Sequence, residues 1–141
     1  MKEWEEYEEQ IFSKLREDFP NAEILKNQRI SGIFSKSSRQ IDVLVKSTVV
    51  GQSMQIVIDC KKFNGKVNVK TVESFIGMVE DIGAHMGIII TNVGFTKGAM
   101  NRVKSYTRDI KCLIVEFKKL DDYDFTWFQC LACDPEYRIR V

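Results

Sequence analysis

Two acidic side chains and a lysine fall where the sequence predicts neighbouring strands to lie side by side. Residues 55–63 read QIVIDCKKF, an apolar strand that ends with Asp59 and Lys61. Because side chains alternate between the two faces of a strand, these two point to the same side. If residues 50–53 form a hairpin turn, Asp42 lies opposite Asp59 or Lys61, about 5 Å away. Two carboxylates that close repel each other unless a cation lies between them, and Mg²⁺, which binds oxygen ligands, is the natural candidate.

A third acid, Glu8, belongs to the first predicted helix. It falls between Trp4, Ile11 and Leu15, near the centre of the apolar stripe. A carboxylate is rarely buried without a partner, so we expect Glu8 to meet a metal, a metal-bound water or a basic group. The alternative is a short helix whose glutamate reaches the rim of the apolar face and the solvent.

The acid-x-Lys spacing is not selective by itself. It occurs three times, at residues 59–61, 109–111 and 116–118. Of the three, residues 59–61 alone end a strand that a predicted hairpin pairs with another acid-bearing strand. A predicted helix follows them. The context therefore selects Asp59 and Lys61.

Apolar periodicity predicts the order helix, three strands, helix, strand, helix and strand. Pro20 ends the first helix, and Thr96 is the expected N-cap of the last one. The order predicts an α/β (α+β) fold with a mixed central sheet flanked by helices on both faces. The expected elements are a helix over 4–19, strands over 24–30, 41–50 and 54–61, a helix around 72–79, a strand over 87–90, a helix from 96 to about 106 and a strand over 112–117.

The length predicts a single domain over residues 1–141. We expect its core at about 7–117 and a C-terminal extension at 119–141. In that extension Tyr123, Phe125 and Trp127 alternate as in a strand, while Phe128 and Leu131 also fit a helix. The extension packs on the core or forms the edge of a homodimer.

Composition and charge restrict the class of protein. Hydrophobic residues make up 44% of the chain, enough for one core. The net charge of +1 is unevenly distributed: residues 1–18 carry −4, residues 19–118 carry +7 and residues 119–141 carry −2. A basic middle segment fits binding to a phosphate backbone and equally fits a solvated surface.

No apolar run approaches the about 20 residues of a membrane helix, and the N-terminal residues are too acidic for a signal peptide. We therefore expect a soluble, cytoplasmic protein without a membrane partner. Cys60 and Cys112 fall in apolar strands, which fits free thiols in a reducing compartment. Cys130 and Cys133 have metal-ligand spacing, but a structural zinc site needs four ligands and no second pair is present. His85 is the sole histidine, which disfavours histidine-dependent triads.

Three segments resemble the Mrr-type restriction endonucleases of the PD-(D/E)xK superfamily. They read SRQIDV at 38–43, IVIDCK at 56–61 and GIIITNVGFTKGA at 87–99. The resemblance covers about residues 7–117, and Tyr7-Glu8 matches the aromatic-Glu pair of the family's first helix. Two positions depart from the family pattern, since Ile41 stands where proline is common and the second acid is Asp rather than Glu.

The resemblance implies a restriction endonuclease-like core of αβββαβ order and a Mg²⁺-dependent endonuclease that hydrolyses DNA, with Mn²⁺ as a substitute ion. It implies Asp42, Asp59, Glu8 and the main-chain carbonyl of Cys60 as metal ligands. Lys61 would assist the attacking water, and burial beside the metal is expected to lower its pKa. The implied products are a 5′-phosphate and a 3′-hydroxyl. An alternative on the same fold is a catalytically inactive nucleic-acid-binding or assembly module.

Basic residues around these segments are candidate phosphate contacts, which position a duplex without reading its sequence. Each of them is also an ordinary solvated surface residue in the alternative interpretation. The candidates are Lys36, Arg39, Lys62, Lys66, Lys70, Lys97 and Arg102.

Overall fold

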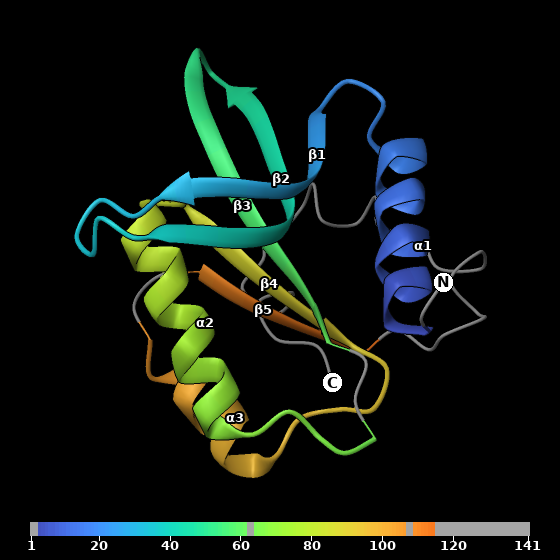
Figure 1. Cartoon of the computed structure of the whole chain (residues 1–141), viewed down its shortest axis with the longest axis vertical. Helices are drawn as coiled ribbons and strands as arrows, with labels where there is room; N and C mark the ends of the chain where they lie inside the picture. The colour runs from blue at the N-terminus through green and yellow to red at the C-terminus, as the bar shows by residue number, and fades with distance from the viewer. Residues whose placement is uncertain (1–2, 62–63, 107–108, 115–141) are drawn as a thin grey trace.

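The computed structural model describes residues 3–61, 64–106 and 109–114. The described elements follow the predicted order. Figure 1 shows one sheet with helices on either side. The elements are α1 (Glu3–Asp18), β1 (Glu23–Ser31), β2 (Ser38–Val49), β3 (Gln52–Lys61), α2 (Val69–Ile82), β4 (Met86–Thr91), α3 (Lys97–Lys104) and β5 (Asp109–Ile114).

The sheet is mixed, as the sequence predicts. Its strand order is β1-β2-β3-β4-β5. The pairs β1–β2 and β2–β3 are antiparallel, whereas β3–β4 and β4–β5 are parallel and are connected through α2 and α3. The carboxyl ends of β3 and β4 therefore lie at the same edge of the sheet.

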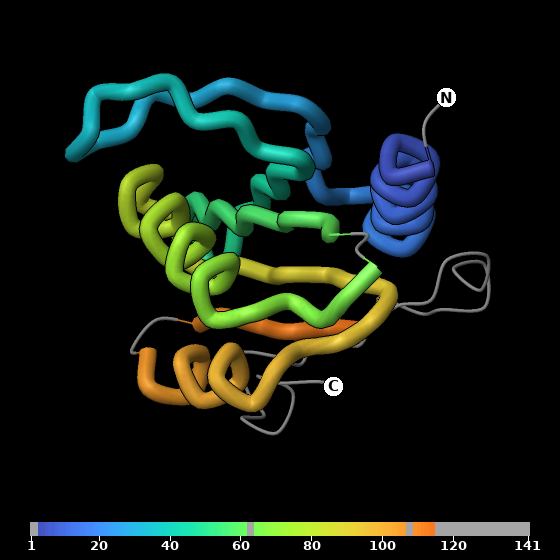
Figure 2. Tube along the Cα trace, turned by 60° about the horizontal axis from the view of Figure 1, so that its bottom comes forward, coloured from blue at the N-terminus to red at the C-terminus, as the bar shows by residue number. Residues whose placement is uncertain are grey.

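Each face of the sheet has its own apolar core. On one face Tyr7, Ile11 and Leu15 of α1 pack against residues such as Val43 and Ile58. On the opposite face α2 and α3 cover the strands, with a cluster that includes Phe75, Val79 and Val103. Figure 2 shows the layers from a second direction. Helices on both faces are confirmed.

Strand β1 bends sharply at Asn27, directly opposite Asp42. Lys26 pairs with Val43 and Gln28 pairs with Ile41, but Asn27 and Asp42 form no pair in this ladder. Asn27 has φ 53°, in the left-handed region that Asn tolerates better than most residues. Figure 1 shows the resulting change of direction.

The bend reverses which core each hairpin strand faces. In β1, Ile24 and Ile30 are an even number of residues apart and would face the same side of a regular strand. Ile24 nevertheless packs with α1, whereas Ile30 packs against the opposite cluster. In β2, Ile41 belongs to the α2 side and Val43 to the α1 side, although simple alternation places them together. Asp42 lies at the point where the two faces are exchanged.

The β2–β3 turn consists of Val50 and Gly51, one residue earlier than the Gly51-Gln52 connection in the predicted strands. Val50 has φ 51° and Gly51 φ 76°, the two positive values of a type I′ hairpin turn. Val49 pairs with Gln52 and Val43 with Ile58. This register continues to Asp42 opposite Asp59, one of the two pairings that the sequence allowed.

Other differences are small. Trp4, assigned to the apolar stripe of the first helix, is 46% exposed, so burial along α1 begins at Tyr7. The last strand begins at Asp109 rather than at Cys112. Residues 115–141 lie outside the described residues, and with them the predicted extension, its aromatic residues and the Cys130/Cys133 pair. In the described part of the chain, no helix is both long and apolar enough to cross a membrane.

Candidate active site

Strand β3 delivers Asp59 and Lys61 to the edge of the sheet where β3 and β4 end. Asp59 pairs in the ladder with Ile89 and Lys61 with Thr91, so both lie beside the last residues of a buried parallel strand. The Asp59 side chain is nearly buried, and its Oδ2 atom lies 3.0 Å from Nζ of Lys61. The predicted acid and lysine therefore form an ion pair on one face of β3.

Asp42 joins this pair from the adjacent strand. The backbone N–H of Cys60 donates to Oδ2 of Asp42 over 3.2 Å. Burial, followed by the hydrogen bond and the negative charge of Asp59, raises the pKa of the Asp42 carboxyl to about 8. A raised pKa is the expected response of a buried carboxyl to a second carboxylate in contact.

Lys61 remains a cation in this environment. Burial lowers the pKa of its ammonium, but the charge and hydrogen bond of Asp59 outweigh that effect, and the pKa is raised overall. In this arrangement an acid 3.0 Å away stabilises the charged form. The expected lowering of the Lys61 pKa concerns burial beside a bound metal and stays a prediction.

Glu8 approaches Asp42 from the α1 side of the sheet. Glu8 and Asp42 line a pocket of about 210 Å³ together with Asn27 at the bend of β1. Burial and the charge of Asp59 raise the pKa of Glu8. An ion pair between Glu9 and Lys26 ties α1 to β1 next to this pocket. Glu8 thus reaches the electrostatic environment of the two aspartates.

A cleft of about 450 Å³ opens on the other side of Asp42. Its walls come from β2, from the end of β3 and from the first turns of α2, where the Asn68 side chain caps the helix by accepting from the backbone N–H of Thr71 over 3.1 Å. Sequence reasoning missed several of these polar side chains because a helix surface gives no local signal of what it faces. The lining residues are Arg39, Gln40, Asp42, Asp59, Lys61, Lys70, Thr71, Ser74, Phe75 and Met78.

A family model described as restriction endonuclease, Mrr_cat, matches residues 3–121. The chain belongs to this Mrr-type restriction endonuclease family. Among curated proteins, none matches the sequence.

Solved structures share the fold of this restriction endonuclease domain. A protein of unknown function, AF1548, has a TM-score of 0.58 and 18% identity over 75% of the chain. The DNA modification-dependent restriction endonuclease AspBHI has a TM-score of 0.52 and 14% identity over 94% of the chain. The restriction endonuclease MspJI in complex with a 27-mer oligonucleotide has a TM-score of 0.47 and 14% identity over 75%. The chain spans 57%, 33% and 24% of these three structures, respectively.

The side chains of the restriction endonuclease site fit a divalent cation with two acidic ligands. In residues 3–61, 64–106 and 109–114, no three Cys, His, Asp or Glu side chains are grouped closely enough to hold a metal ion. Asp42 and Asp59 do meet, and burial together with the hydrogen bond and charge of Asp59 raises the pKa of Asp42. Since Mg²⁺ is usually held by one or two carboxylates, this pair fits, and Glu8 as a direct ligand stays a prediction.

The predicted DNA contacts lie partly in the cleft and partly elsewhere in the described chain. Lys70 and Arg39 line the cleft itself, and Arg39 also donates from Nε to Asp81 over 2.9 Å. Lys36 is exposed in the β1–β2 loop. The guanidinium of Arg102 lies over the ring of Tyr106, 5.8 Å from its centre.

Lys66 and Lys97 are exposed in the segments that follow β3 and β4. These two segments are joined by a bridge between Val67 and Phe95. Lys62 lies outside the described residues. The structure therefore brings Lys70 and Arg39 to the acid pair, and the remaining candidates stay predictions.

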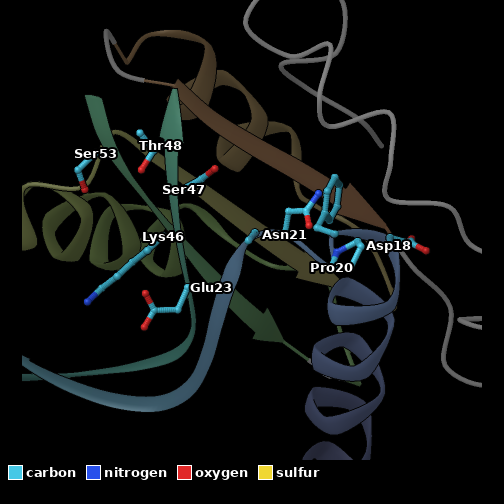
Figure 3. Close-up of a pocket in the computed structure, with 10 residues that line it drawn as sticks. Asp18, Pro20, Asn21, Glu23, Lys46, Ser47, Thr48 and Ser53 are labelled. Atoms are coloured by element: carbon cyan, nitrogen blue, oxygen red, sulfur yellow. The ribbon is translucent and has the colours of Figure 1, made fainter. Parts of the chain in front are cut away.

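Another hollow, of about 640 Å³, lies between the end of α1 and the outer part of the β2–β3 hairpin. Figure 3 shows the side chains that line it, among them Glu23, Lys46 and Ser53. It lies toward the turn of the hairpin, away from Asp42 and Asp59. None of the predicted catalytic residues lines it, so its size does not make it the active site.

Proposed function

We propose that this domain is a Mg²⁺-dependent endonuclease that hydrolyses phosphodiester bonds of DNA. The observation that carries the proposal is the meeting of Asp42, Asp59 and Lys61 in one cleft at the end of β3. Membership of a restriction endonuclease family supports a nuclease. DNA as the substrate is supported by the net positive charge of residues 19–118 and by AspBHI, a DNA modification-dependent restriction endonuclease with a similar fold.

The acids of this site would hold the cation. Asp42 and Asp59, with the main-chain carbonyl of Cys60, are the proposed ligands of Mg²⁺ or Mn²⁺, and Glu8 would add negative charge from the α1 side. When bound, the ion polarises the scissile phosphate and lowers the pKa of a water molecule. Burial and the adjacent acids raise the pKa of the Cys60 thiol, so this side chain stays neutral and takes no part as a nucleophile.

Lys61 acts as a cationic donor. Because its pKa is raised, its ammonium stays protonated at neutral pH and orients the attacking water or stabilises negative charge on the phosphate oxygens. Asp59 holds that ammonium in place through the 3.0 Å contact. Lys70, on the wall of the same cleft, would contact the DNA backbone.

Nicking of supercoiled plasmid in the presence of Mg²⁺ tests the proposal. Asp59→Ala and Lys61→Ala are each expected to lower the cleavage rate by about 100-fold or more, because each removes a group that acts on the reacting phosphate or water. Glu73→Gln is the matched control, since Glu73 is an exposed acid on α2 outside the cleft. Equal cleavage by the wild type and both alanine variants would reject the proposed active site.

A second candidate is a catalytically silent nucleic-acid-binding module. It is favoured by the lack of a third clustered side-chain ligand in the part of the chain that the structure describes. It predicts salt-sensitive DNA binding that no divalent metal changes. Calorimetric uptake of Mn²⁺ by the wild type, lost in Asp42→Ala, would exclude it in favour of the nuclease.

A further inference from the structure

The β1–β2 hairpin carries charged side chains of one sign over residues 24–41. Residues 24–41 contain four basic side chains and no acid, and four serines lie among them. The outer half of this hairpin, beyond the bend at Asn27, reaches over α2, as Figures 1 and 2 both show. It therefore forms a basic arm at the side of the molecule.

The tip of this arm is apolar. Phe34 is 77% exposed and Ile33 is 51% exposed. Two adjacent large apolar side chains at a loop tip leave much apolar surface in water, which is typical of an interaction site. Arg29 precedes them and Lys36 and Arg39 follow them in the sequence, so the apolar tip carries a basic surround.

Asp81 of α2 holds the backbone of the tip in one conformation. Its carboxylate, only 4% exposed as a residue, accepts from the backbone N–H groups of Phe34 and Ser35 over 3.0 and 2.9 Å and from the Ser35 hydroxyl over 2.5 Å. Its backbone carbonyl accepts from the N–H of Ile33 over 2.6 Å. Hydrogen bonds from Ser35 hold the pKa of Asp81 well below its usual range. Exposure of Phe34 is therefore built into the fold.

The same network links the tip to the cleft. Arg39 donates to Asp81 from Nε and also lines the cleft that contains Asp42. Along β2, Ser38 and Asp42 are separated by four residues, or about 13 Å at the rise of a strand. That distance corresponds to about four base pairs of a duplex lying in the cleft.

We propose that Ile33 and Phe34 form a wedge that stacks on, or inserts between, the bases of the DNA substrate about four or more base pairs from the cleaved phosphate. The basic surround would contact the phosphates while the aromatic ring contacts bases, as apolar wedges and stacking platforms do in nucleic-acid-binding proteins. The inference rests on the proposed function for the identity of the substrate, but it assigns no role in bond cleavage to the tip.

Binding without metal separates this inference from the nuclease itself. We would measure fluorescence anisotropy of a labelled duplex of about 30 base pairs in EDTA, between about 50 and 200 mM KCl. Phe34→Ser is expected to weaken binding about tenfold at every salt concentration, and Phe34→Tyr to bind as the wild type. Lys36→Ala is expected to reduce the salt slope by about one. Val50→Ser is the matched control, because Val50 is a 94% exposed apolar residue at the other hairpin tip.

A duplex with 2-aminopurine about four base pairs from the cleavage position gives an independent signal. Unstacking by the wedge is expected to raise its fluorescence with wild type and not with Phe34→Ser. Unchanged affinity and fluorescence in Phe34→Ser would overturn the inference. It would also be overturned if Phe34→Ser kept its DNA affinity but lost self-association in sedimentation experiments, because the tip would then be a contact between copies of the chain. If Phe34→Ser binds DNA more weakly but the wild type does not cleave DNA, the wedge is supported and the proposed nuclease activity is rejected.

Discussion

Replacing Asp42 with asparagine is expected to stabilise the protein at alkaline pH. The folded Asp42 carboxyl has a pKa of about 8 against an ordinary value of 3.8. The folded state therefore binds this proton more tightly than the unfolded state does. The stability from this group is fully present below about pH 4 and is lost as the pH rises toward 8. Asparagine keeps a similar shape but carries no charge at any pH.

The magnitude follows from the difference between the two pKa values. About four pH units correspond to about 6 kcal/mol as an upper limit. The carboxyl is only partly buried and lies beside a second carboxylate, Asp59, so we expect about 2–3 kcal/mol at pH 8.5 after allowing for solvent screening. For a chain of this size that is a rise in Tm of about 6–10 °C. At pH 5 the difference should shrink to less than about 1 kcal/mol.

Urea unfolding followed by tryptophan fluorescence at pH 5 and pH 8.5 measures this effect. Glu73→Gln, which removes an exposed acid from α2, serves as the control and should leave the pH dependence of the wild type unchanged. Mg²⁺ should recover part of the stability of the wild type at pH 8.5 and none in Asp42→Asn. If the Asp42→Asn variant loses stability with rising pH as steeply as the wild type, the loss of stability does not come from this carboxyl.

Substitutions at three further positions test backbone features of the hairpins. Val50→Asn should stabilise the protein by about 1 kcal/mol in urea, because Asn accepts the left-handed φ of 51° that a β-branched residue resists. Asn27→Gly should retain plasmid cleavage, whereas Asn27→Val should reduce it at least about tenfold by straightening β1 opposite Asp42. Gly32→Ala should lower the unfolding free energy by about 1–3 kcal/mol in urea, since its Cβ would lie 2.0 Å from Oδ2 of Asp81.

Local patterns were sufficient for the elements and for the acid pair. Apolar alternation and the turn placed Asp42 opposite either Asp59 or Lys61, and the structure selects Asp59. Thr96 is confirmed as an N-cap, since its side chain accepts from the backbone N–H of Ala99. These features depend on residues close in sequence or on one hairpin register, which is why the sequence reveals them.

Long-range features were not accessible in the same way. Asp81 contacts a loop 46 residues away, and nothing near it in the sequence distinguishes it from a solvated helix acid. Asn tolerates the left-handed region, but this preference does not predict that the backbone adopts a left-handed conformation at Asn27. The bend depends on which core each half of the hairpin covers, and that is decided by the packing of α1 and α2.

The bend explains how acids from two faces of one sheet act on the same point. On a regular strand, a residue that faces Asp59 and the α2 side is separated by the sheet from a glutamate on α1. At Asp42 the hairpin exchanges its faces, so this residue lines both the pocket shared with Glu8 and the cleft shared with Asp59. The hairpin can exchange its faces there because Asn27 and Asp42 form no pair in the β1–β2 ladder. The same irregularity turns the outer hairpin over α2, so the position of the acid pair and the reach of the basic arm have one cause.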